Sequence, residues 1–119
     1  MSASRPVTAE VELAPERVES WLAEDGELQV IDVREPYEHD AGHIDGTRHI
    51  VLGSLSEQAG SIAREHPVVF YCRVGSRSLM AAQAFRAAGY EAYSMEGGLR
   101  RWAQEGRALS PADGTVANH

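Results

Sequence analysis

Apolar positions follow two patterns that alternate along the chain. The continuous apolar run Val68–Cys72 predicts a buried strand, and the length and β-branched content of Leu28–Val33 predict another. Shorter strands are expected at His49–Val51 and Glu91–Ser94. Apolar residues at helical spacing predict helices at Pro15–Ala23, at Leu52–Glu65, from Ser76 or Ser78 to Ala88, and around Leu99, Trp102 and Ala103 up to Gly106. Such alternation predicts an α/β fold with a small, mainly parallel sheet covered by helices on both faces.

Glycine, proline and serine set the expected ends of these elements. The segment 34–42 begins with a proline turn and allows only a short helical stretch before Gly42, and Pro67 prevents a helix beyond His66. Ser76 or Ser78 is expected to cap the third helix, and Gly89 to end it. Its predicted inward face consists of Leu79, Met80, Ala82, Ala84, Phe85 and Ala88.

The length of 119 residues suits one domain, which we expect over residues 9–107. Residues 1–8 and 108–119 have few apolar positions and no periodicity, so flexible termini are predicted there. The longest apolar run is far shorter than the roughly 20 residues of a membrane-spanning helix. The first residues also lack the apolar region of a secretory signal, which makes the cytoplasm the expected location.

The charge balance is acidic, with 18 Asp and Glu residues against 11 basic residues, all of them arginine. A net charge of −7 argues against a nucleic-acid partner, and a small acidic domain is expected to be a monomer. The arginines are unevenly distributed, because Arg73 and Arg77 flank a short loop after the most apolar run. A local site for a small anion is therefore expected inside an acidic protein.

Cys72 is the single cysteine of the chain, which excludes a disulfide within it. A lone cysteine is most often a small core residue, but this one ends the best predicted strand. In an open parallel sheet, ligands bind beyond the carboxyl ends of the strands. Asp32 ends the neighbouring predicted strand, so both side chains are expected at that edge.

The loop after Cys72 joins that strand to the third helix. Backbone N–H groups of Arg73, Val74, Gly75, Ser76 and Arg77 can converge on an anion there, and the helix N-terminus adds partial positive charge. Together with the two guanidinium groups, this setting favours a thiolate over a thiol and makes Cys72 the candidate nucleophile.

Three segments resemble the rhodanese family. The loop Cys-Arg-Val-Gly-Ser-Arg-Ser at 72–78 resembles its active loop, residues 32–44 its upstream signature, and Glu96-Gly-Gly-Leu-Arg-Arg-Trp102 its C-terminal one. The resemblance covers roughly residues 9–107. It implies a small α/β fold and transfer of sulfane sulfur through a persulfide on Cys72.

The resemblance implies an anionic sulfur donor such as thiosulfate, an acceptor that is cyanide or a thiol and can belong to a protein, and no cofactor or metal. Thiosulfate, a persulfidated cysteine desulfurase, glutathione persulfide and mercaptopyruvate all stay open as donors. A different hypothesis is a non-enzymatic sulfur-relay or protein-interaction module. Related phosphatases and arsenate reductases are a weaker alternative, because only four residues separate Cys72 from Arg77, one fewer than in the phosphatase loop.

Other polar residues have structural interpretations. Asp32 and Arg34 are expected to support the loop through charge-assisted hydrogen bonds, and Ser78 to support it from the helix. His39, His43 and His49 suggest a metal only weakly, because Gly42 interrupts a shared helical face. Trp102 is expected in the core, and Gly97-Gly98 at the turn into the last helix.

Overall fold

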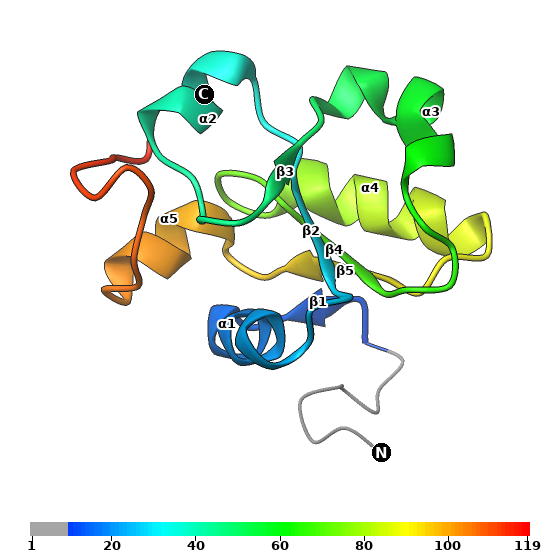
Figure 1. Ribbon diagram of the computed structural model, residues 1–119. Helices are drawn as coiled ribbons and strands as arrows, with labels where there is room; N and C mark the ends of the chain where they lie inside the picture. Colours follow the sequence, from blue (N-terminus) through cyan, green and yellow to red (C-terminus); the bar gives the residue numbers. More distant parts are fainter. Residues whose placement is uncertain (1–9) are drawn as a thin grey trace.

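A computed structural model describes residues 10–119 and shows a parallel sheet between two layers of helices (Figure 1). Within these residues the sheet has five strands in the order β1-β5-β4-β2-β3, and every neighbouring pair is parallel. The strands are β1 (Glu12–Leu13), β2 (Gln29–Asp32), β3 (Arg48–His49), β4 (Val68–Tyr71) and β5 (Ala92–Met95). The predicted α/β fold is confirmed.

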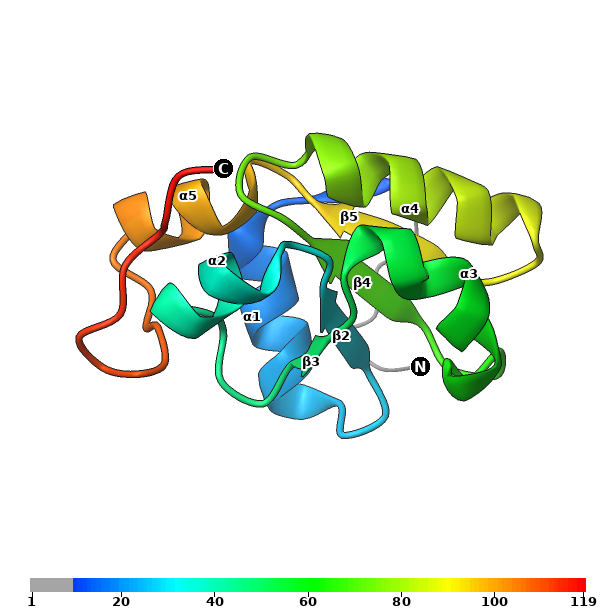
Figure 2. The same cartoon turned by 90° about the horizontal axis from the view of Figure 1, so that it is seen from above.

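The helices cover both faces of the sheet. α1 (Pro15–Glu24) and α5 (Gly98–Gln104) pack on one face, and α3 (Leu55–Gln58) and α4 (Ser76–Ala87) on the other. The predicted short helix after β2 is confirmed as α2 (Pro36–Ala41). It lies beyond the carboxyl ends of the strands, close to α5 (Figure 2).

The central strand β4 divides its side chains between two cores, as the period of two in a strand requires. Val68 and Phe70 lie in the core under α3 and α4, whereas Val69 and Tyr71 lie in the core under α1 and α5. Cys72 follows in the same alternation and therefore faces the α4 side. All five of these residues are fully buried.

The continuous helix expected over residues 52–65 is wrong. The segment forms three short pieces, η1 (Leu52–Ser54), α3 and η2 (Ala59–Ser61), and Ile62 is already extended. The carboxamide of Gln29 explains the end, since it bonds both the N–H and the carbonyl of Ala63 at 2.8 and 3.0 Å. Gly53 and Gly60 further weaken the helix, because glycine costs about 1 kcal/mol relative to alanine there.

Some smaller predictions also need correction. The third strand is Arg48–His49 rather than His49–Val51, and the two-residue strand β1 was not predicted. Neither serine caps α4, because Gly75 occupies the N-cap position. Three residues that were predicted to point inward are exposed, namely Met80, Ala84 and Ala88. Ala81 and Ser78 take their place against the sheet.

The C-terminal residues 108–119, expected to be flexible, pack against the domain. Ser110 forms an isolated antiparallel bridge with His43, and the N–H of Thr115 donates to the carbonyl of Ala41 at 2.8 Å. Leu109 and Val116 pack on the core beneath α1 and α5. The predicted flexible segment 1–8 lies outside the described residues. Among residues 10–119 no helix is long and apolar enough to cross a membrane.

Candidate active site

The sulfur of Cys72 lies at the start of α4, where two backbone N–H groups point at it. The N–H groups of Gly75 and Ser78 lie 3.1 and 3.4 Å from Sγ, and the Ser78 hydroxyl lies 3.5 Å from it. The sulfur thus occupies the acceptor position that a capping oxygen takes at most helix starts. Converging N–H and O–H donors of this kind form a concave site that can hold a negatively charged atom.

Glycines shape the backbone around this cradle. Gly75 has φ +105°, a left-handed conformation that residues with a side chain rarely adopt. Gly98 has φ +61°, and a Cβ there would lie 2.5 Å from the carbonyl oxygens of Cys72 and Arg73. The next N–H groups of α5, those of Leu99 and Arg100, bond these two carbonyls at 2.8 and 2.9 Å. The start of α5 therefore holds the first half of the loop from behind.

Arg77 is paired with a buried carboxylate. Its guanidinium donates two hydrogen bonds to the carboxylate of Glu38, at 2.8 and 3.0 Å, and the Glu38 side chain is fully buried. These bonds raise the pKa of Arg77, against the opposing effect of burial. Burial raises the pKa of Glu38, but the Arg77 bonds, the Glu35 backbone N–H and the charges of Arg77 and Arg34 together keep that pKa below its ordinary value. The expected free cation at position 77 is thus neutralised within the protein.

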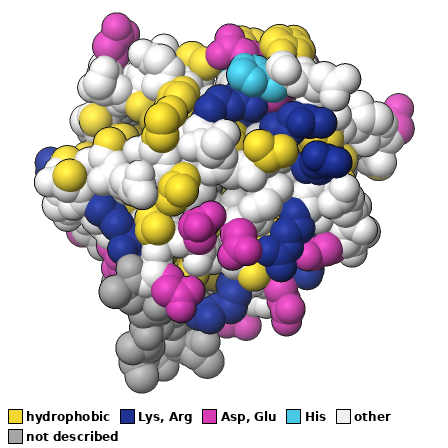
Figure 3. Space-filling view, turned by 180° about the vertical axis from the view of Figure 1, so that it is seen from behind, with side chains coloured by type: hydrophobic (Ala, Val, Ile, Leu, Met, Phe, Trp, Pro, Cys, Tyr) yellow, Lys and Arg dark blue, Asp and Glu magenta, His cyan; other side chains and the backbone are white. Residues whose placement is uncertain are grey.

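Arg73, the other loop arginine, has no carboxylate partner among residues 10–119. One guanidinium N–H donates to the side-chain oxygen of Asn118 at 3.3 Å, and Nε is buried without an acceptor in the same range. On the face seen from behind, arginine side chains gather in one area although the chain is acidic overall (Figure 3). The remaining loop residues Val74 and Ser76 are exposed.

A buried ion pair lies behind α2. Asp32 accepts hydrogen bonds from Nε and Nη2 of Arg34 at 2.9 and 2.7 Å, and Arg34 also donates to the carbonyl of Gly42 at 2.7 Å. Burial raises the pKa of Asp32, but the bonds from Arg34 and His39 outweigh it and lower that pKa. Both side chains are fully buried, as expected for an ion pair that supports the structure around it.

The three histidines that suggested a metal only weakly, His39, His43 and His49, come together beside this pair. The His39 ring stacks on those of His43 and His49, with centroids 3.9 and 4.5 Å away. Burial lowers the pKa of His39, and the neighbouring rings lower it further, although Asp32 opposes them. Within residues 10–119 no cluster of His, Cys, Asp and Glu has the arrangement of a metal site.

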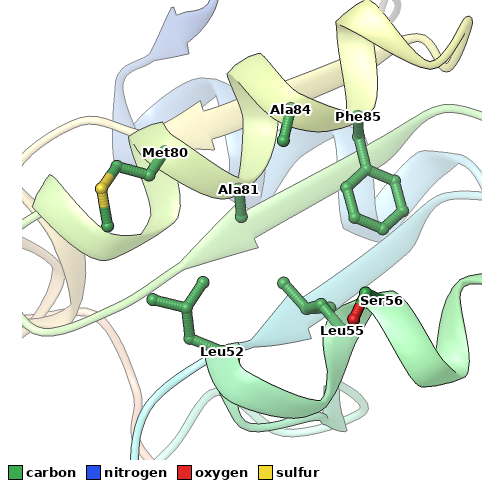
Figure 4. A pocket seen from close by; sticks show the side chains of 7 residues that line it. All are labelled: Leu52, Leu55, Ser56, Met80, Ala81, Ala84 and Phe85. Carbon is green, nitrogen blue, oxygen red and sulfur yellow. The ribbon is translucent and has the colours of Figure 1, made fainter.

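An apolar pocket of about 280 Å³ lies between α3 and α4 (Figure 4). Its lining residues point toward one another from η1, α3 and α4: Leu52, Leu55, Ser56, Met80, Ala81, Ala84 and Phe85. Cys72 is not among them. Cys72 has no exposed surface at all, so a donor reaches its sulfur only after the loop or a neighbouring side chain moves.

Several residues that build the site were not singled out from the sequence. Glu38 lies in the predicted short helix, where an acidic residue is ordinary, and Asn118 lies in the tail. Ser94, which bonds the Ser78 hydroxyl at 2.7 Å, offered one signal, since it is a polar residue inside an apolar strand. Trp102 lies in the core, and Gly97-Gly98 forms the turn into α5, both as predicted.

The profile of the rhodanese-like domain matches residues 14–105, which is most of the chain. The chain belongs to the rhodanese-like domain family. The matched range contains β2, β3, β4 and β5 and the Cys72 loop, whereas β1 lies just before it.

Three similar proteins support the assignment to the rhodanese-like domain family. The thiosulfate sulfurtransferase GlpE of Pseudomonas aeruginosa is 37% identical over 102 residues, which cover 85% of this chain and 87% of GlpE. The uncharacterized protein YqhL of Bacillus subtilis is 44% identical over 75 residues, or 62% of this chain and 60% of YqhL. A crystal structure of a rhodanese-related protein from Thermoplasma volcanium superposes with a TM-score of 0.76 at 26% identity, covering 82% of this chain and 95% of that one.

Proposed function

We propose that this rhodanese domain is a sulfurtransferase that carries sulfane sulfur as a persulfide on Cys72. The observation that supports this most directly is the position of Sγ, with two backbone N–H groups of the α4 start within 3.4 Å. That position stabilises a thiolate and afterwards the negative terminal sulfur of a persulfide. The named relative GlpE supports thiosulfate as a donor.

The first step is a displacement at the outer sulfur of thiosulfate. The Cys72 thiolate forms a bond to that sulfur, the sulfur–sulfur bond of thiosulfate breaks, and its electron pair leaves with sulfite. One negative charge on Cys72 and two on thiosulfate become one on the persulfide and two on sulfite. Arg73 faces the dianion with an uncancelled charge, and the N–H groups of the loop contact its sulfur.

The second step returns Cys72 to the thiolate. Cyanide or a thiolate acceptor attacks the terminal sulfur, and the persulfide bond breaks with its electron pair returning to Sγ. With cyanide the product is thiocyanate. Both steps are displacements at sulfur, so neither requires an electron acceptor from outside the reactants.

The other residues hold the loop in shape. We assign Arg77 to this group rather than to donor binding, because Glu38 cancels its charge. Ser78 links the loop to Ser94, and Asp32 with Arg34 supports α2, which carries Glu38. A monomer working in the cytoplasm is part of the proposal, since a reducing compartment keeps the free thiol available.

Four residues between Cys72 and Arg77 form a tight loop, which suits one sulfur atom better than a phosphoryl group. The non-enzymatic relay remains the second candidate, because full burial of Cys72 favours a partner that opens the loop. The two candidates differ in turnover: an enzyme releases thiocyanate repeatedly, whereas a relay loads Cys72 and then waits for its partner.

The test is a steady-state assay of thiocyanate formation from thiosulfate and cyanide. The Cys72→Ser variant should lose at least about a thousandfold of the wild-type rate, as removal of a nucleophile does. Ser56→Ala in the apolar pocket is the matched control and should keep the wild-type rate. Full activity in Cys72→Ser would reject the nucleophile, and one turnover per wild-type chain would favour the relay.

A further inference from the structure

The segment 108–118, called the C-terminal strap below, folds back over the domain after α5. The indole N–H of Trp102 donates to the carbonyl of Ala108 at 2.8 Å. Ser110 and His43 then exchange both backbone hydrogen bonds, at 3.0 and 2.7 Å. The strap thus begins on α5 and continues along the segment that follows α2.

Close backbone packing holds the middle of the strap. A Cβ on Gly42 would lie 2.4 Å from the carbonyl oxygen of Thr115, so only glycine fits at position 42 while the strap is in place. The N–H of Thr115 bonds the carbonyl of Ala41, and Val116 packs on the core that contains Trp102. These contacts fix the course of the strap up to its last residues.

The end of the strap reaches the loop of Cys72. The side-chain oxygen of Asn118 accepts a hydrogen bond from Nη2 of Arg73 at 3.3 Å. An amide oxygen holds a guanidinium through a hydrogen bond and leaves its charge in place. A carboxylate would hold the guanidinium and also neutralise its charge. The contrast with Arg77, which is paired with Glu38, leaves Arg73 as the loop arginine whose charge is available to a ligand.

The strap lies beyond the part of the chain that matches the rhodanese-like domain, which ends at residue 105. Its contact with Arg73 is therefore an addition to the domain. The Nε–H of Arg73 is buried and has no acceptor within residues 10–119, so one donor of this guanidinium is unsatisfied.

We propose that Asn118 is a positioning residue, which holds Arg73 beside the Cys72 loop with its charge intact and so gives the site a preference for dianionic sulfur donors. This inference rests on the proposed sulfur transfer for its biological meaning. Apart from sulfur transfer, the proposal states that the affinity of the site for a dianion depends on a neutral side chain at position 118.

The experiment measures binding apart from turnover, by calorimetric titration of anions into the full-length Cys72→Ser chain. Thiosulfate is the dianion, and methanethiosulfonate is a monoanion that carries the same outer sulfur. In this background Asn118→Asp should weaken thiosulfate binding about tenfold, because the carboxylate cancels the charge of Arg73. The loss for methanethiosulfonate should be about threefold.

Three further variants define the role. Asn118→Ala keeps the charge and loses only the anchor, so about a twofold loss is expected. Asn118→Gln keeps an amide oxygen and should restore most of the affinity, and His119→Ala is the matched control, with no change. In the chain with Cys72 intact, Asn118→Asp should raise KM for thiosulfate while kcat stays within about twofold.

Equal thiosulfate affinity in Asn118→Asp and its parent would overturn the proposal, as would an equal loss in His119→Ala. A loss of the same size for both anions would reject the dianion preference, and undetectable thiosulfate binding to the parent would reject the anion site. If the wild-type chain binds thiosulfate but transfers no sulfur, the proposed function fails, while the titrations still decide the role of Asn118.

Discussion

Charged side chains are paired with opposite charges on one side of the Cys72 loop and with a neutral group on the other. On the α2 side, Glu38 and the Asp32–Arg34 pair are fully buried, and each charge has a partner within the protein. On the strap side, Arg73 is half-buried, and within residues 10–119 its guanidinium bonds the neutral amide of Asn118 and no carboxylate.

From this difference we expect the α2 side to maintain the shape of the Cys72 loop and the strap side to bind the sulfur donor. Charges that are paired and buried fix the geometry of the loop, but they have little attraction left for a ligand. A charge at the surface with a neutral anchor contributes little to folding and remains available to an anion. Changes on the α2 side should therefore alter stability first, and changes on the strap side should alter donor affinity first.

The largest effect is expected from Arg34→Ala, which leaves the Asp32 carboxylate buried without its main partner. Loss of one member of a buried pair costs about 3–5 kcal/mol, a large part of the stability of a small domain. Urea unfolding followed by circular dichroism measures it. Arg73→Ala serves as the comparison and should change the free energy of unfolding by less than about 1 kcal/mol. Equal losses of unfolding free energy in Arg34→Ala and Arg73→Ala would contradict the assignment of stability to the α2 side and of donor binding to the strap side.

A smaller loss of stability is expected from Glu38→Gln. The neutral amide keeps one acceptor for Arg77 but no charge, so the free energy of unfolding should fall by about 1–3 kcal/mol. The same urea titration measures this change. Gln58→Glu, at a surface position of α3, is a control for altered charge. A Glu38→Gln chain as stable as wild type would show that the Arg77 pair does not hold the loop.

On the other side, Arg73→Ala should raise KM for thiosulfate about tenfold, which corresponds to about 1.4 kcal/mol. The reason is the loss of the loop charge that no carboxylate cancels. Arg48→Ala, remote from the loop, is the matched control for loss of a surface arginine. An unchanged KM in the thiocyanate assay, with stability reduced instead, would place Arg73 with the structural residues.

The smallest effect concerns pH. The folded chain lowers the pKa of His39, chiefly by burial, so below the ordinary value of 6.5 the unfolded chain binds the proton more readily. The contribution of His39 is therefore present above pH 6.5 and lost as the pH falls below 6.5 through the lowered pKa of the folded chain. His39→Gln should flatten this part of the stability curve by less than about 1 kcal/mol per pH unit, measured by urea unfolding at each pH. His66→Gln, beside exposed Glu27, is the control. An unchanged slope in His39→Gln would contradict the effect of burial on the pKa of His39.

Short-range signals predicted most of the fold. The apolar run ending at Cys72 and the glycine-containing loop after it act through local backbone preferences, which one stretch of sequence reveals. The helix expected over residues 52–65 failed because the carboxamide of Gln29, from a distant strand, takes the hydrogen bonds of Ala63. Such a contact has no local signature.

The candidate site divides in the same way. The cradle of Cys72 is local and follows from the strand-to-helix turn. The partners of its arginines are not local: Glu38 lies 39 positions before Arg77, and Asn118 lies 45 positions after Arg73. The tail was interpreted as flexible from its composition, yet backbone bonds to Ala41 and His43 hold it in place. Backbone bonds form with almost any sequence, so composition did not reveal them.

The central claim is that Cys72 carries the transferred sulfur, and peptide mass spectrometry after brief exposure of the protein to thiosulfate tests it most directly. The account predicts a gain of one sulfur atom, about 32 Da, on the peptide that contains Cys72, and its loss when cyanide is added. The Cys72→Ser chain should gain nothing. A wild-type chain that gains no sulfur, or a Cys72→Ser chain that gains as much, would contradict the account.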